Sequence, residues 1–386
     1  MIAVRVIDQP EDWDALADAW DALLPDSPTD NPFVAFEWLS LWWQSFASPG
    51  DRLRIVAAFR DGVLCAAAPL CWRRERIMGI PVRSLRSLTN PHTPKYDWLW
   101  PKRDPDTITA LLDAICGQTD WDVLRLDYVP GESATLPMLA EFARQRRLRS
   151  TVEWCMSSPY VAIRQSWDEY HASLSKNFRA QNRQAERRLR ETGSLEVVEI
   201  RGGPELDAAL GRAYAIEQSS WKGEAGTAIA DQPHEERFYT QMAKAAARRG
   251  WFRLFFLELD GRPIAFCYCL DYKRVMKSVK IGYDPAYGKY SPGTILKLLM
   301  LRPLFEQRSH DKFDMLGAAT PHKLRWGKEL QELRSAYLFR HGVRGKLAYE
   351  MLFGVKKRLE RYPRVREVLR RLKAGAFARK EAEARE

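Results

Sequence analysis

Residues 275–299 read VMKSVKIGYDPAYGKYSPGTILKLL, and this stretch decides the fold. Val275, residues 278–281 and Tyr283 are largely β-branched or aromatic, which favours a strand, and turn-forming Asp, Pro and Gly follow them. A helix is expected next, because Ser291 suits the N-cap, Pro292 suits the first helical position and apolar residues then recur at helical spacing. We expect Pro303 to disturb that helix. The order is therefore strand, glycine-containing loop and capped helix.

Such a corner can bind phosphate. The N–H groups at a helix start are free, and the positive end of the helix dipole lies behind them. Gly288 and Gly293 would let the backbone approach a phosphate closely, and Lys289 adds charge. The dinucleotide fingerprint is absent, and residues 282–290 miss the P-loop pattern, so we do not expect nucleotide hydrolysis. The alternative is an ordinary corner whose glycines only turn the chain.

The composition is that of a folded protein. The chain has 386 residues, of which 46% are hydrophobic and 29% are charged, so it is long enough for two domains with substantial cores. The segment after Met1 turns acidic at once, and the longest apolar run, residues 63–72, is too short to span a bilayer. We expect a cytoplasmic protein, with peripheral association with the inner face of the cell membrane as a variant of that expectation.

The cysteines and histidines do not indicate a metal site. There are six of each, without a Cys-x-x-Cys pair or metal-ligand spacing. We expect no metal and interpret the cysteines as buried free thiols; they are Cys65, Cys71, Cys116, Cys155, Cys267 and Cys269.

The positive charge is concentrated at the C-terminal end. The formal net charge is +11, and from Arg340 onward Lys and Arg outnumber Asp and Glu by nine. Residues 344–386 also carry apolar residues at near-helical spacing, which predicts a basic amphipathic helical tail. Such a helix can dock on its own domain, which is the commoner role, or lie on an anionic membrane.

Two hairpins indicate an internal repeat. Residues 54–70 (RIVAAFRDGVLCAAAPL) resemble residues 253–270 (RLFFLELDGRPIAFCYCL), and each contains an Asp-Gly pair that is typical of a tight turn. After the next strand of the first copy, at residues 80–85, no glycine-rich helix start follows, so we expect that copy to lack a phosphate loop.

The remaining elements follow from periodicity and turn signals. Helices are expected at residues 11–24, 31–46, 106–116, 135–148, 166–192 (one helix or a pair), 204–220 and 232–250. Strands are expected at residues 2–7, 122–128, 160–163, 194–200, 312–316 and 335–340, with a turn at 157–159. The fold class is α/β (α+β).

The helical stretch 166–192 carries a basic face. Arg179, Arg183 and Arg187 recur every four residues and therefore lie on one side of the helix. A solvated surface is the usual explanation of such a face, but a cationic face would also attract a phosphate-rich ligand.

Five motifs resemble one enzyme superfamily. They are LSKNFRAQNRQAERRL (174–189), SSWK (219–222), ELDGRPIAF (258–266), IGYDPAYGKYSPG (281–293) and FDMLGAATPHKLRWG (313–327). The chain resembles the GNAT acyltransferases, its repeat resembles the tandem arrangement of Fem-type proteins, and within that group it resembles the CelD-type acetyltransferases of cellulose and exopolysaccharide biosynthesis. The resemblance implies two tandem GNAT-like domains, each a mixed, mostly antiparallel sheet flanked by helices, at residues 1–160 (degenerate) and 161–343 (catalytic), followed by the tail at 344–386.

The resemblance also implies how acetyl-CoA, or another acyl-CoA, would bind. In GNAT proteins the strand before the loop splays from its neighbour and offers main-chain groups to the pantetheine arm, while loop amides hold the pyrophosphate. The residues implied for the pantetheine are Ile281, Gly282 and Tyr283, and those implied for the pyrophosphate are Tyr290, Ser291, Gly293 and Thr294. The loop departs from the usual Q-x-x-G-x-G/A pattern.

Direct attack of an amine or hydroxyl on a thioester needs a base, a donor to the carbonyl oxygen and a proton for the leaving thiolate. The candidate catalytic residues are Glu217 and Asp314 as bases, Lys323 as electrostatic stabiliser and Tyr283 or Tyr290 as acid. Residues implied for substrate binding are Arg179, Arg183, Trp221, Lys222 and Trp326.

Three interpretations of function remain open. The first is an acyl-CoA-dependent transferase acting on a sugar, or on an amine of an envelope or polysaccharide precursor. The second is peptidyl transfer from aminoacyl-tRNA, as in the Fem-type relatives, for which the basic helix and tail would bind RNA phosphates. The third is a non-catalytic, membrane-associated partner in polysaccharide assembly.

Overall fold

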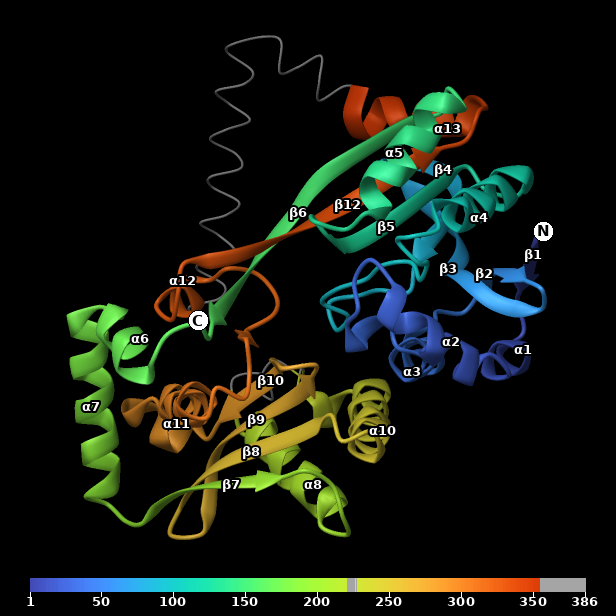
Figure 1. Cartoon of the computed structure of the whole chain (residues 1–386). Coiled ribbons are helices and arrows are strands. Elements are labelled where there is room, and N and C mark those ends of the chain that lie inside the picture. Colours follow the sequence, from blue (N-terminus) through green and yellow to red (C-terminus); the bar gives the residue numbers. More distant parts are fainter. Residues whose placement is uncertain (221–225, 227, 355–386) are drawn as a thin grey trace, which may run out of the picture.

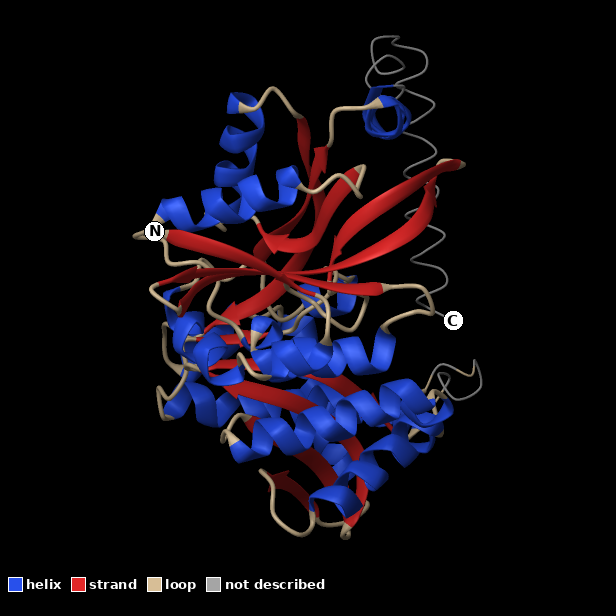
Figure 2. Ribbon diagram, turned by 90° about the vertical axis from the view of Figure 1, so that its right-hand side faces the viewer, coloured by secondary structure: helices blue, strands red, loops and turns tan. Residues whose placement is uncertain are grey.

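The computed structural model describes residues 1–220, 226 and 228–354. These residues form one twelve-stranded sheet with helices packed on it (Figures 1 and 2). The first six strands are β1 (Ile2–Ile7), β2 (Arg52–Arg60), β3 (Val63–Ile77), β4 (Ile80–Ser87), β5 (Val123–Pro130) and β6 (Arg149–Ala162). The others are β7 (Leu195–Ile200), β8 (Phe252–Leu259), β9 (Arg262–Tyr272), β10 (Val275–Tyr283), β11 (Lys312–Asp314) and β12 (Glu329–Phe339).

The sheet confirms the predicted fold class and shows the repeat directly. Its order is β1-β2-β3-β4-β5-β12-β6-β11-β10-β9-β8-β7. In both copies the first four strands are antiparallel neighbours, and the fifth strand pairs with the fourth in parallel. After β4 the chain runs as a loop to α4 (Pro105–Gly117), so this copy has no helix start directly behind its fourth strand, as predicted.

The two copies are joined by an exchange of long strands. β12, at the end of the second copy, lies between β5 and β6, whereas the last residues of β6 pair with β11 (Figure 1). The predicted turn at 157–159 is wrong, because these residues lie inside β6 opposite β12. Pro159 is tolerated there since it removes one donor only, and its carbonyl still accepts the Met315 N–H. The predicted boundary between residues 160 and 161 therefore falls within a strand.

The two predicted hairpins are present, and their turns explain the Asp-Gly pairs. Asp61 and Gly62 have φ angles of 51° and 82°, and Asp260 and Gly261 have 50° and 76°. Two consecutive residues with positive φ match the right-handed twist of the flanking strands, and Asp-Gly accepts this conformation at little cost.

The helices of the first copy follow the predictions with two differences. They are α1 (Pro10–Asp14), α2 (Ala17–Leu23), α3 (Phe36–Phe46), α4 and α5 (Thr135–Gln145). The single helix predicted at 11–24 is broken near Leu16, whose ψ of 3° departs from helical geometry. The helix predicted from residue 31 begins at Phe36, because the 3₁₀ turn Pro32–Val34 and the extended Ala35 precede it.

The second copy contains α6 (Trp167–Ser173), α7 (Lys176–Arg190), α8 (Leu206–Gln218), α10 (Pro233–Arg248), α11 (Pro292–Glu306) and α12 (Pro321–Leu324). The stretch 166–192 is a helix pair, in which the Ser175 side chain caps α7 by accepting the Phe178 N–H. Pro303 does not end α11, which continues to Glu306, since a proline so near the end removes only one late hydrogen bond.

The cores explain how the halves are held together. α8 and α10 pack on one face of the second-copy sheet, and α6, α7 and α11 belong to the cluster of buried residues on the other face. The larger cluster continues across the two copies, since Trp38 of α3 packs edge-on against Phe238 of α10 with ring centroids 5.0 Å apart. The two copies therefore share one hydrophobic core.

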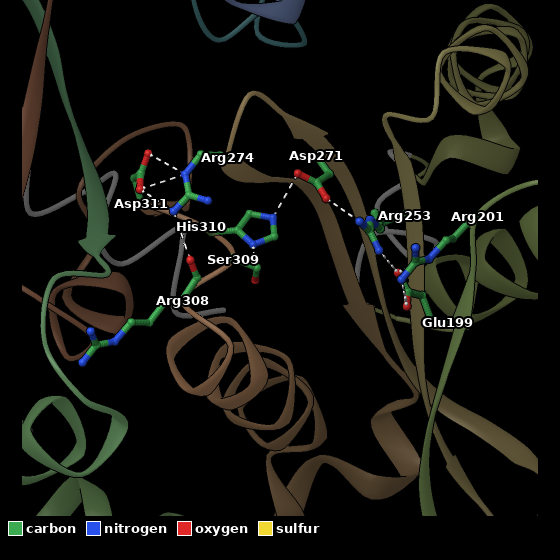
Figure 3. Close-up of polar contacts among 9 residues, drawn as sticks. All are labelled: Glu199, Arg201, Arg253, Asp271, Arg274, Arg308, Ser309, His310 and Asp311. Carbon is green, nitrogen blue, oxygen red and sulfur yellow. Dashed lines mark hydrogen bonds and ion pairs between the residues drawn. The ribbon is translucent and has the colours of Figure 1, made fainter.

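A chain of polar contacts crosses the second-copy strands and anchors the segment before β11 (Figure 3). Asp271 of β9 accepts from Arg253 of β8 at 2.6 Å and contacts His310 at 3.0 Å, and Arg253 continues to Glu199 of β7. Ser309 contacts the other ring nitrogen of His310 at 2.8 Å. The contacting side chains of Ser309, His310 and Asp271 line none of the described cavities. Their contacts fix the start of β11.

The beginning of the predicted tail docks on the first copy. α13 (Val343–Tyr349) and the π turn Glu350–Gly354 bury Ala348 and Phe353 against β4, β5 and β12. The rest of the predicted tail lies outside the described residues. In the described part of the chain, no helix combines the length and apolar character needed to cross a bilayer.

Candidate active site

The site begins where β10 loses one of its neighbours. β10 pairs with β9 along its length, with a register shift between Ser278 and Lys280, but it pairs with β11 only over its first three residues. β11 ends at Asp314, and the chain turns away at Leu316 and Gly317, which have φ angles of 50° and 61°. The second half of β10 therefore has an open edge among the described strands.

A first cavity of about 670 Å³ lies beside this open half of β10 and reaches the start of α11. Its walls come from β10, the loop before α11, the end of α8 and α12. They include Glu217, Ser219, Ser220, Ile281, Gly282, Tyr283, Pro285, Gly288, Ser291, Gly293, Thr294, Lys297, Thr320, His322 and Lys323. The cavity thus gathers all residues predicted for acyl-CoA binding except Tyr290.

The helix start differs in detail from the prediction. Ser291 adopts a left-handed conformation with φ 50°, and its side chain does not cap α11. Its carbonyl instead accepts the N–H groups of Thr294 and Ile295, and Pro292 has no N–H. Among the described residues, the Gly293 N–H is then the donor of the first turn that remains for a ligand. The helix dipole favours an anion at this position.

Two glycines of the site have different roles. A Cβ at Gly282 would lie 2.5 Å from the Phe266 ring, so Gly282 is required for packing of β10 on β9. A Cβ at Gly293 would find its nearest neighbours at 3.7 Å (Tyr283) and 3.8 Å (Ile281), which is ordinary contact. Gly293 therefore leaves space inside the cavity.

Lys323 lies where two cavities meet. It belongs to α12, whose N-cap Thr320 accepts the Lys323 N–H, and its Nζ donates to the Leu316 carbonyl at 2.5 Å. Burial and the charge of Lys297 lower its pKa to about 8, and Asp314 only partly opposes this shift. An ammonium with this pKa can carry charge and can also give up a proton near neutral pH.

Lys297 brings a second cation to the first cavity. It projects from α11, is buried, and its Nζ lies 5.1 Å from the centre of the Trp326 ring. Burial lowers its pKa, although Cys267 and Cys269 on β9 oppose the shift. Lys297 and Lys323 thus place two amino groups on this wall of the cavity, and in their protonated form they would attract a phosphorylated ligand.

The two candidate bases are placed differently. Glu217 is buried on α8, lines the first cavity and accepts the Ile229 N–H at 2.9 Å. Asp314 is also buried but lines none of the described cavities, and it pairs with Lys95 at 2.5 Å and Lys312 at 3.5 Å. Although burial opposes it, these lysines hold the pKa of Asp314 at about 2. A carboxylate with so low a pKa is a poor base, and its contacts suit a structural role.

The other predicted residues are only partly brought together. Tyr283 lines the first cavity, whereas Tyr290 lies on a separate hollow with Tyr287 and Lys289. Arg179 and Arg183 line a groove along α7. Trp326 is fully buried against Phe178, with ring centroids 5.2 Å apart. Trp221 and Lys222 lie outside the described residues.

A second cavity of about 400 Å³, which Lys323 also lines, opens between the two copies. The first copy contributes Pro91, His92, Thr93, Pro94, Tyr128 and Met156. The second copy contributes Tyr239, Ser278, Val279, Lys280, Met315, Leu316, Gly317, Ala318 and Lys323. Sequence analysis missed these residues of the first copy, because they carry no motif and reach the site only through the packing of one copy on the other. Among the described residues, no cluster of His, Cys, Asp and Glu could hold a metal.

Comparisons with known proteins bear on the second copy and on the fold of the whole chain. Residues 176–324 match the family model described as Acetyltransferase (GNAT) domain. A search of curated proteins finds no match. A crystal structure of FemX is 12% identical, with 90% of this chain and 99% of that chain covered and a TM-score of 0.57.

Two further solved structures share the fold. A protein of unknown function from Bacteroides thetaiotaomicron is 13% identical, with 88% of this chain and 100% of that chain covered and a TM-score of 0.52. The C-terminal domain of a protein from Agrobacterium fabrum, provisionally assigned as a lysylphosphatidylglycerol synthetase, is 11% identical, with 89% and 96% covered and a TM-score of 0.50. At these identities the likeness concerns the fold alone.

Proposed function

We propose that this protein transfers an acyl group, in the first instance acetyl, from acyl-CoA to an amine or hydroxyl. One observation carries the proposal: the open edge of β10 and the start of α11 enclose a cavity that meets a second cavity at Lys323. Two ligands, one in each cavity, could therefore approach the same lysine, as a transfer between two substrates requires.

The first cavity would hold the acyl-CoA. The diphosphate would lie at residues 291–294, where the Gly293 N–H and the dipole of α11 favour an anion, with Lys297 adding charge. The pantetheine arm would follow Ile281, Gly282 and Tyr283 along the open edge of β10, as the family resemblance implies. The thioester would then reach Lys323.

The chemistry follows from the groups near that point. The acceptor attacks the thioester carbonyl, and the Lys323 ammonium stabilises the developing oxyanion. Glu217 is the carboxylate of the first cavity that could accept a proton, and Tyr283 could supply one to the leaving thiolate. The acceptor would bind in the second cavity.

The acceptor class is proposed from the resemblance to the CelD-type enzymes. A saccharide, or an amine of a polysaccharide or envelope precursor, would fit that resemblance. Glucosamine, and its derivatives that are substituted on the nitrogen or on an oxygen, are therefore the first acceptors to assay.

Calorimetric titration with acetyl-CoA tests the proposal. We expect saturable binding with 1:1 stoichiometry, and thiol release from acetyl-CoA when an acceptor is present. CoA without the acyl group should bind to the same site and therefore compete with acetyl-CoA. A protein that shows no affinity for acetyl-CoA at millimolar concentration would rule out the proposal.

The groove along α7 favours a second candidate, transfer from an aminoacyl-tRNA. Lys176, Arg179, Arg183 and Arg187 line this groove, and the FemX likeness supports it at the level of fold. RNA bound there should dissociate steeply with salt. Titration with tRNA at 50 and 200 mM salt, repeated with Arg183→Glu, separates the candidates: salt-sensitive binding that the variant loses would favour tRNA, and unchanged weak binding would exclude it.

A further inference from the structure

The loop of residues 88–104 in the first copy places His92 in the wall of the second cavity. The His92 ring stacks on Phe46 with centroids 5.0 Å apart and planes 3° from parallel. Its Nδ1 lies 2.8 Å from the Tyr239 hydroxyl, and its Nε2 lies 3.3 Å from Glu235 Oε1. The imidazole is thus fixed by contacts with α3 and with two residues one turn apart on α10.

The contacts define the protonation pattern. The Glu235 carboxylate can only accept. In the neutral imidazole, therefore, Nε2 is the nitrogen that carries the proton, and Nδ1 accepts a hydrogen bond from the Tyr239 hydroxyl. Burial alone would raise the pKa of Glu235, but His92, Lys280 and His234 hold it below its ordinary value. Burial and the charge of Glu235 raise the pKa of Tyr239, which is therefore a phenol at neutral pH.

These groups lie on the acceptor side of the site. His92 and Tyr239 line the second cavity, which Lys323 also lines. The Tyr239 side chain is otherwise buried, with its ring packed edge-on against Phe238 and Tyr268. The hydroxyl is therefore its polar group, and its oxygen still has capacity to accept a hydrogen bond.

We propose that Tyr239, His92 and Glu235 form the proton relay that activates the acceptor, so that the first copy contributes directly to the reaction. This inference rests on the proposed function. It replaces Glu217 as the base of the transfer, and Lys323 replaces Tyr283 as the acid that protonates the thiolate. Tyr239 touches the acceptor, while His92 and Glu235 are positioning residues that act through it.

The proton balance of the step is complete. The acceptor N–H or O–H donates to Tyr239 Oη while its heavy atom bonds to the thioester carbonyl carbon, and the phenol proton moves to His92 Nδ1. The resulting imidazolium is stabilised by Glu235. The carbon–sulfur bond then breaks, and the thiolate takes a proton from the Lys323 ammonium. Loss of the imidazolium proton to solvent and reprotonation of Lys323 restore the starting state.

The same contacts could serve only to join α10 to the first copy, so the variants must separate the two roles. Tyr239→Phe removes one oxygen and keeps the buried ring, and Glu235→Gln keeps the size of its side chain. His92→Ala leaves a space beside Phe46 that an added imidazole could enter. His341→Gln is the matched control, because His341 is exposed and contacts the Arg146 carbonyl at the far end of β12.

The experiment measures acetyl-CoA binding and thiol release with glucosamine and hydroxylamine as acceptors in the full chain. We expect His92→Ala and Tyr239→Phe to lower kcat by about 10²–10⁴-fold with unchanged acetyl-CoA affinity. Added imidazoles should restore His92→Ala in proportion to their pKa, because a base responds to basicity and a packing defect does not.

The possible results distinguish the two proposals. Wild-type turnover in both His92→Ala and Tyr239→Phe overturns the relay, as does rescue that is independent of the pKa of the imidazole. Both of those results leave acyl-CoA transfer intact. Failure of the wild-type chain to bind acetyl-CoA would instead overturn the proposed function, and the relay with it.

Discussion

The Nζ atom of Lys323 donates a 2.5 Å hydrogen bond to the main-chain carbonyl of Leu316. Leu316 has a positive φ of 50°, which is uncommon for a leucine and turns the chain away from β10 directly after β11. The strained turn opens the edge of β10, and the lysine bound to it stands at the boundary of both cavities. Backbone strain and a cation therefore coincide at the proposed point of transfer, which is where such strain is often found.

Replacing Lys323 with alanine should affect turnover more than binding. The variant loses the donor to the developing oxyanion, so we expect kcat to fall about 10²-fold. The dissociation constant for acetyl-CoA should change little, because the proposed diphosphate site lies at the start of α11. Steady-state thiol release measures kcat, and calorimetry measures the dissociation constant for acetyl-CoA. Lys328→Ala is the control, because Lys328 is exposed. Turnover equal to that of the control would remove Lys323 from the mechanism.

The pH dependence of kcat should follow the protonation of Lys323. Its pKa is lowered to about 8, so the ammonium is present below pH 8 and is lost as the pH rises through that value. We expect kcat to decline above about pH 8. In Lys323→Arg the charge persists, and the decline should move to higher pH. In Lys297→Met a neighbouring cation is lost, which should raise the pKa of Lys323 and shift the decline in the same direction. Identical pH profiles for all three proteins would contradict the assignment.

Filling the space at Gly293 should block acyl-CoA. A Cβ added here lies at ordinary contact distance from Tyr283 and Ile281, so a side chain can start from this position without displacing the backbone, and tryptophan would then fill the cavity. We expect Gly293→Trp to weaken acetyl-CoA binding by at least about 100-fold, or about 3 kcal/mol. Gly211→Trp on α8 is the control, because that glycine faces open space. The melting temperatures of both variants should stay near that of the wild type, and retained affinity in Gly293→Trp would place the ligand elsewhere.

We expect Asp314 to stabilise the folded state. Replacing it with asparagine leaves Lys95 and Lys312 without their buried partner, so we expect a loss of about 3–5 kcal/mol in the free energy of unfolding. Its folded pKa of about 2 is below the ordinary value near 4, so its contribution is present above pH 4 and is lost as the pH falls toward 2. Urea unfolding at several pH values measures both effects.

A control for Asp314 lies in the same region. Asp311→Asn removes an exposed ion pair with Arg274, and we expect little change in stability from it. If Asp314→Asn were as stable as Asp311→Asn, the buried contacts of Asp314 with Lys95 and Lys312 would contribute no more to stability than an exposed ion pair.

Local signals in the sequence predicted the elements of the fold well. The Asp-Gly turns, the strand at 275–283 and the helix pair at 166–192 follow from residue preferences that act within a few positions. Ser291 occupies the predicted N-cap position of α11, but its side chain makes no capping hydrogen bond. The residue is in a left-handed conformation, and its carbonyl accepts the N–H groups of Thr294 and Ile295 instead. The exchange of β6 and β12 could not be predicted, since pairing across about 180 residues leaves no local pattern.

The residues of the candidate site also fall into two groups, those that local motifs indicate and those that meet only through the tertiary structure. Gly293, Thr294 and Lys323 lie on motifs within one copy, and the sequence analysis found them. His92, Glu235 and Tyr239 meet only because the two copies share a core, and a single histidine in a proline-rich loop carries no signal of its partners. The Lys95–Asp314 pair, which crosses the same boundary, was missed for the same reason.

The most direct measurement of the central claim is a crystal structure of the protein with acetyl-CoA. The account predicts that the diphosphate lies within hydrogen-bonding distance of the Gly293 N–H, with the pantetheine along Ile281 and Tyr283 and the thioester carbonyl facing Lys323 Nζ. A diphosphate bound along α7, or a first cavity that stays empty while the ligand occupies another surface, would contradict it.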